Sequence, residues 1–96
     1  MKLADINRII LQVMNEELTR SINRNHPIVQ NYFSYIKNVI DDEDYLSKVE
    51  PDALIISCEN FLVENKIRIN GSIRIKANER WLSDGTVFSK NVIRFI

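Results

Sequence analysis

The spacing of the hydrophobic residues changes near residue 66, and the sign of the charge changes at the same place. Up to residue 65, apolar residues recur every three or four positions, which predicts amphipathic helices. From Lys66 onward they alternate with polar residues, which is typical of strands. Residues 1–65 carry 6 Lys or Arg and 11 Asp or Glu, whereas residues 66–96 carry 7 and 2. The sequence therefore predicts an α+β protein, with an acidic helical part (1–65) followed by a basic β part (66–96).

Length and composition indicate one globular domain that covers residues 1–96. The chain has 45% hydrophobic and 27% charged residues, which is typical of folded proteins rather than disordered ones. Its single cysteine cannot form an internal disulfide, and its longest apolar run, residues 53–56, is too short to cross a membrane. We therefore expect a cytoplasmic protein without membrane contact. The abundance of Ile, Asn and Lys is typical of low-GC bacterial or phage genomes.

Three or four helices are predicted in the acidic part. Apolar residues from Leu3 to Ile22 form one stripe, and Pro27 fits the first position of a second helix that is capped by Asn25 or His26. The acidic run 41–44 suits the first turn of a short helix. The expected helical segments are residues 3–22, 27–40, a short one after 41–44, and 51–65.

Two hairpins are predicted in the basic part. The first turns at Asn70-Gly71, and a three-residue loop (70–72) would place the isoleucines of strands 66–69 and 73–76 on one face. The second turns at Asp84-Gly85 and would pair Trp81 with Phe88, and the last strand continues to residue 96. The expected architecture is three or four N-terminal helices followed by a three- to four-stranded antiparallel sheet.

This register gathers four cations on one face of the sheet. They are Lys66, Arg68, Arg74 and Lys76. Like charges that face each other across a strand pair are destabilising, so something should offset that cost. Three explanations stay open: solvated side chains, an internal partner such as the 41–44 acids or Glu79, or an external anion. The four residues are the predicted partner-binding site.

The expected partner is a protein with an acidic surface, and nucleic acid is the alternative. Single-strand binders interleave cations with exposed aromatics, and residues 66–76 contain no aromatic. Trp81 and Phe88 are candidate aromatic contacts, although such a pair more often belongs to a core. A winged-helix mode is disfavoured because helix 52–65 has no basic residue. A homodimer that pairs the opposite charges also fits the pattern.

The sequence does not suggest catalysis. His26 stands beside Pro27 at a helix boundary, where capping is its simplest role, and Cys58 falls on a helix stripe, as a buried residue would. The acids 41–44 are better explained by a helix start than by a divalent-metal site. Gly71 and Gly85 do not precede a helix in this interpretation, so they form no phosphate-binding loop. We therefore expect a non-catalytic regulatory or adaptor protein without a cofactor or metal.

Overall fold

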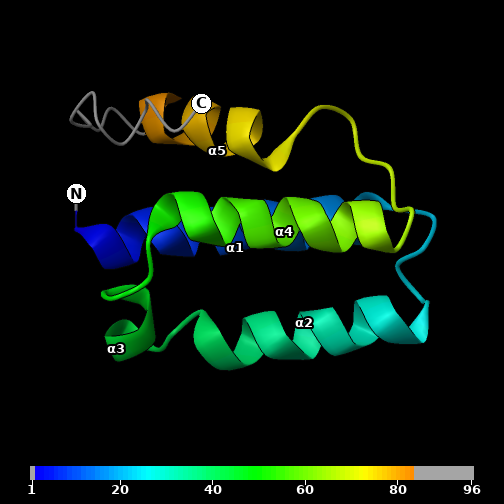
Figure 1. Ribbon diagram of the computed structural model, residues 1–96, viewed down its shortest axis with the longest axis horizontal. Helices are drawn as coiled ribbons and strands as arrows, with labels where there is room; N and C mark the ends of the chain where they lie inside the picture. Colours follow the sequence, from blue (N-terminus) through cyan, green and yellow to red (C-terminus); the bar gives the residue numbers. More distant parts are fainter. Residues whose placement is uncertain (1, 84–96) are drawn as a thin grey trace.

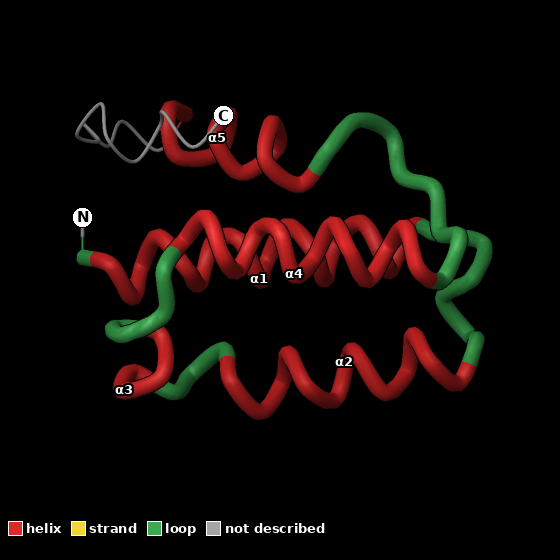
Figure 2. Tube along the Cα trace, in the orientation of Figure 1, coloured by secondary structure: helices red, strands yellow, loops and turns green. Residues whose placement is uncertain are grey.

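The computed structural model describes residues 2–83, and this part of the chain consists of helices and loops (Figures 1 and 2). The helices are α1 (Leu3–Arg20), α2 (Pro27–Val39), α3 (Glu43–Leu46), α4 (Pro51–Glu64) and α5 (Ile73–Ser83). Helix α1 packs against each of the other four. In Figure 1, α4 lies in front of α1, with α2 and α5 on opposite sides. The described residues contain no strand, so the predicted α+β fold with an antiparallel sheet is wrong.

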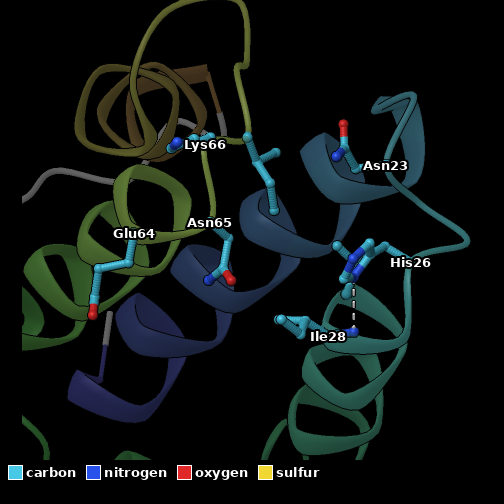
Figure 3. A pocket seen from close by; sticks show the side chains of 8 residues that line it. Asn23, His26, Ile28, Glu64, Asn65 and Lys66 are labelled. Atoms are coloured by element: carbon cyan, nitrogen blue, oxygen red, sulfur yellow. Dashed lines mark hydrogen bonds between the residues drawn. The ribbon is translucent and has the colours of Figure 1, made fainter.

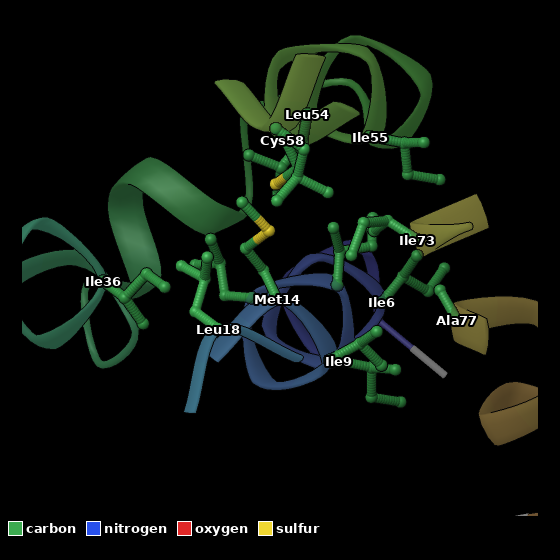
Figure 4. Close-up of a cluster of buried hydrophobic side chains, with 14 of the residues drawn as sticks. Ile6, Ile9, Met14, Leu18, Ile36, Leu54, Ile55, Cys58, Ile73 and Ala77 are labelled. Carbon is green, nitrogen blue, oxygen red and sulfur yellow. The ribbon is translucent and has the colours of Figure 1, made fainter. Parts of the chain in front are cut away.

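Helix α1 is the centre of the core. Ile10, Leu11, Met14 and Leu18 are fully buried, and 10 of its 18 residues are buried in all. Such a wide apolar stripe needs neighbours on several sides. Figure 4 shows Met14 and Leu18 packed with side chains from α2 and α4. This helix agrees closely with the prediction for residues 3–22.

The starts of α2, α3 and α4 follow local sequence signals. The Nδ1 atom of His26 accepts a hydrogen bond from the backbone N–H of Ile28 at 3.2 Å, and Pro27 occupies the first turn of α2. The Asp42 carboxylate caps α3 by accepting from the N–H of Tyr45 at 3.1 Å. Pro51 begins α4. The predicted helices 27–40, the short one after 41–44 and 51–65 are therefore confirmed.

A buried asparagine ties the short helix α3 to the core. The Asn7 side chain is fully buried in α1, and its Nδ2 donates to the carbonyl oxygens of Leu46 and Val49, both at 2.8 Å. A buried amide is costly unless it is hydrogen-bonded, so these two bonds favour one position for the α3 turn. The acidic segment is thereby held at one end of the helices.

The predicted first hairpin is wrong because residue 72 starts a helix. The Ser72 hydroxyl accepts from the N–H of Ile75 at 3.1 Å. A carboxylate oxygen of Glu59, from α4, accepts from the N–H groups of Ile73 at 2.7 Å and Arg74 at 3.3 Å. Three amides that a helix start leaves without partners are thus satisfied. Gly71 (φ +92°) belongs to the loop before α5 rather than to a hairpin turn.

The isoleucine alternation misled the prediction because burial in this region follows a spacing of four. Ile73, Ala77 and Trp81 are all fully buried, whereas Ile75 is 52% exposed. A strand would have placed Ile73 and Ile75 on one face. Trp81 lies in α5 and therefore does not begin the predicted second hairpin. Phe88, the Asp84-Gly85 turn and the last strand lie outside the described residues.

We expect Ser72→Ala to lower the free energy of unfolding by about 1 kcal/mol, because it removes a helix cap. Ser72→Asp should keep most of the stability, since aspartate also caps. Urea unfolding followed by circular dichroism measures both. Ser57→Ala, at an exposed position inside α4, is the matched control and should change stability by less than about 0.5 kcal/mol. Equal effects of the Ala substitutions at 72 and 57 would contradict the cap.

Candidate docking surface

Helix α5 uses its cations inside the protein, against acids of α1 and α4. Arg74 lies 2.5 Å from an Asp52 carboxylate oxygen, and Lys76 lies 3.7 Å from Glu17. Arg80 donates two hydrogen bonds to Glu16, at 2.8 and 2.7 Å. Much of the charge difference between the two parts of the chain is therefore satisfied at the α5 interface. An internal partner was one of the three explanations, but the acids concerned are on α1 and α4 rather than in 41–44 or at Glu79.

The other two predicted partner-binding residues lie apart from this interface. Lys66 and Arg68 are exposed in the loop after α4, and neither has a side-chain partner among residues 2–83. Lys66 has φ +56°, and the following N–H, of Ile67, bonds back to the carbonyl of Leu62 at 2.8 Å. This is the usual end of a helix, at a position that favours glycine. The structure thus divides the predicted site into two separate pairs.

A polar hollow of about 260 Å³ lies beside Lys66, where the start of α2 meets the end of α4. Figure 3 shows His26 and Ile28 of α2 across from Glu64 and Asn65 of α4. The Nδ1 atom of His26 is engaged as the cap of α2. Glu64 and Lys66 give the hollow mixed charge, so its lining does not favour an ion of either sign.

The largest uncharged surface feature is an open groove of about 360 Å³ between α2 and α4. Its lining comprises Ile28, Asn31, Tyr32, Tyr35, Ser57 and Phe61. The Tyr32 ring packs on Phe61 with 4.2 Å between centroids, and on Tyr35 with 5.4 Å. An adjoining hollow continues over Ala53, Ile56 and Asn60. We call this surface the α2–α4 groove, including Ile56 on its α4 edge.

The outer side of α4 carries almost no charge. Between Ala53 and Val63 the only charged residue is Glu59, and it bonds to the start of α5. Ile56 is 45% exposed and Val63 is 75% exposed, while Leu54, Ile55, Cys58 and Leu62 are buried on the other side. A helix that is apolar on opposite sides is usually covered on both. The outer side of α4 therefore resembles the centre of a protein interface, which is depleted of charge.

The hydroxyl and thiol groups beneath the groove remain neutral at physiological pH. The Tyr32 hydroxyl lies 3.5 Å from the Cys58 sulfur, and the Tyr35 hydroxyl lies 2.9 Å from that of Tyr45. Burial raises the pKa of Cys58 to about 11 and also raises the pKa of both Tyr32 and Tyr35. The predicted burial of Cys58 is confirmed, and its thiol is poorly suited to act as a nucleophile.

The acidic run 41–44 serves the local structure. Besides the Asp42 cap, Glu43 pairs with Arg8, and Asp44 lies 3.0 Å from Lys48. Within residues 2–83, no three His, Cys, Asp or Glu side chains are grouped so that they could hold a metal ion. None of the five described helices has the length and apolar character needed to cross a membrane. Comparison of the chain with protein-family models, curated proteins and solved structures found no match.

The groove was not recognised from the sequence. Tyr32, Tyr35 and Phe61 belong to the helix stripes that predict a core, and they are only partly covered. One signal could have found it: residues 53–63 alternate between two apolar sides with a single charge. In contrast, the predicted aromatic contact Trp81 is fully buried and is not part of any surface.

The ion pair between Glu16 and Arg80 should make stability depend on pH. The hydrogen bond from Arg80 and the positive charge of that residue lower the pKa of Glu16 below its usual value, against a smaller opposing effect of burial. The unfolded state therefore binds more protons, so this contribution is present at neutral pH and is lost as the pH falls below about 4.5. Glu16→Gln should be less stable at pH 7, by about 0.2–1 kcal/mol, and should lose less stability on acidification.

Urea unfolding at pH 3 to 7 measures this difference. Glu64→Gln is the matched control, because Glu64 is exposed and has no ion pair among residues 2–83. Identical pH profiles for the wild type and Glu16→Gln would contradict the assignment.

The thiol of Cys58 should react only when the protein opens. We expect a thiol reagent at pH 8 to label the native protein no faster than unfolding allows, because the thiol is buried and protonated. Stopped labelling analysed by mass spectrometry measures the rate, and urea-unfolded protein is the control. Rapid labelling with an unchanged helical signal would disprove burial.

Proposed function

We propose that this protein is a non-catalytic binding protein that docks on another polypeptide through the α2–α4 groove. The observation that supports this most is the absence of charge from an exposed, aromatic-lined surface in a chain with 27% charged residues. Exposed patches of this kind mark protein interfaces more often than they mark inert surface. The cytoplasmic location expected from the sequence remains part of this proposal.

Charged residues at both ends of the groove would form the rim of such an interface. Lys66 and Arg68 lie beyond the end of α4, and the acidic segment that contains α3 precedes its start. Charges at a rim increase the association rate and select the orientation more than they add affinity. Lys66 and Arg68 thus keep a proposed role in partner contact. Arg74 and Lys76 instead connect α5 to the helices that carry Asp52 and Glu17.

A nucleic-acid partner is less compatible with this surface. Stacking on bases needs aromatic rings beside cations, and the rings of the groove line a surface without cations. The exposed cations Lys66 and Arg68 have only aliphatic residues, Ile67 and Ile69, between and beside them. We therefore propose a protein partner, which a shallow dependence of binding on salt would distinguish from phosphate binding.

We expect Ile56→Glu to abolish association, because it places a carboxylate in the uncharged groove. Loss of affinity should be at least about tenfold, as for central residues of an interface. Chemical cross-linking of the tagged protein in the cells that produce it, followed by mass analysis, reports the complexes. Ile75→Glu is the matched control: Ile75 is 52% exposed, against 45% for Ile56, but it lies on α5.

The wild type and Ile75→Glu should give the same cross-linked species, and Ile56→Glu should lack them. Circular dichroism confirms that each variant is folded. If Ile56→Glu retains every complex, the groove is not the docking surface.

A further inference from the structure

The two ends of the α2–α4 groove carry opposite charge. Residues 41–50, which contain α3, comprise five acids and one base. At the other end, the loops around α2's start and α4's end carry Arg20, Arg24, Lys66 and Arg68, against Glu17 and Glu64. Figures 1 and 2 show that α3 and these loops lie at opposite ends of the helices. The molecule is therefore electrically polar along the groove.

Internal ion pairs do not remove this polarity. At the acidic end, Glu43 and Asp44 have basic partners, whereas the exposed Asp41 and Glu50 have no side-chain partner among residues 2–83. At the basic end, Arg20 pairs with Glu17, whereas Lys66 and Arg68 are unpaired in the same part of the chain. Each end thus presents charge that is free to meet an opposite charge outside the protein.

We propose that the groove binds the groove of a second copy of this chain, in an antiparallel homodimer. This inference rests on the proposed function, since it names the partner of the same surface. Two identical faces pack symmetrically when a twofold axis lies in the plane between them. If that axis is perpendicular to the helices, the acidic end of each copy faces the basic end of the other. If it is parallel to them, like charges face each other, so charge selects the antiparallel form.

The same axis places α4 of one copy against α4 of the other. Ile56 and Ser57 are near the middle of α4 (Pro51–Glu64), so they lie close to the axis and to their own symmetry copies. Ile56 would then be covered by an apolar surface of the kind it belongs to. Ala53 and Asn60, one on each side of this centre, would face one another across the interface.

The oligomeric state of the purified protein tests the proposal. Analytical ultracentrifugation should show a dimer whose dissociation constant rises at least about tenfold in Ile56→Glu and remains unchanged in Ile75→Glu. Charge reversal at one end, by Lys66→Glu with Arg68→Glu, should also weaken the dimer. Further reversal at the other end, by Asp41→Lys with Glu50→Lys, should restore it. Failure of this restoration would overturn the antiparallel pairing of charges.

Disulfide trapping tests the orientation. Ala53→Cys and Asn60→Cys are both at exposed positions, and the native Cys58 is buried. An oxidised mixture of the two variants should give a mixed disulfide dimer, in larger yield than either variant alone. Equal or lower yield in the mixture would overturn the antiparallel arrangement.

The two proposals fail in different ways. A protein that stays monomeric at millimolar concentration would overturn the homodimer. The docking surface would still stand if an association with a different protein were lost in Ile56→Glu. Retention of all complexes by Ile56→Glu would overturn both.

Discussion

The arrangement of the other helices depends on the burial of α1. Its apolar residues cover so much of its circumference that one neighbouring helix could not remove them from water. Helices α2, α4 and α5 therefore take positions around it, and the α3 turn is attached through Asn7. This requirement also creates the α2–α4 groove. Each of the two helices turns its most apolar side to α1, and their aromatic flanks meet with an open space between them.

Electrostatic contacts complete the position of α5. Glu59 caps its start, and its basic residues meet acids on α1 and α4. Glu59 would otherwise be a charge on the side of α4 that faces outward, so its use as a cap also removes charge from that surface. The same set of contacts thus attaches the last described helix and leaves the outer side of α4 neutral. What remains unpaired, Lys66 and Arg68 at one end and Asp41 and Glu50 at the other, lies beyond the groove.

The acidic part of the fold was predictable because its signals are local. Pro27, Pro51 and the caps at His26 and Asp42 mark helix starts within a few residues, and the spacing in α1 predicts its buried side. The basic part was mispredicted because Ile67, Ile69, Ile73 and Ile75 satisfy a strand pattern, whereas the evidence for a helix was weaker. Ser72 is a common capping residue, and Ile73, Ala77 and Trp81 have helical spacing, but a decisive contribution comes from Glu59 on another helix. A cap supplied from a distant segment has no local signature.

The sequence by itself determined four of the five described helices, the burial of Cys58 and the opposite charges of its two parts, because hydrophobic spacing, proline positions and charge are properties of neighbouring residues. Only the tertiary structure decided that α5 is a helix, that Arg74 and Lys76 face acids within the protein, and that Tyr32, Tyr35 and Phe61 line a groove. These outcomes depend on which surfaces meet when α1 is buried. A periodic pattern shows that a side chain prefers to be covered, but the packing of the helices determines what covers it and which side stays exposed.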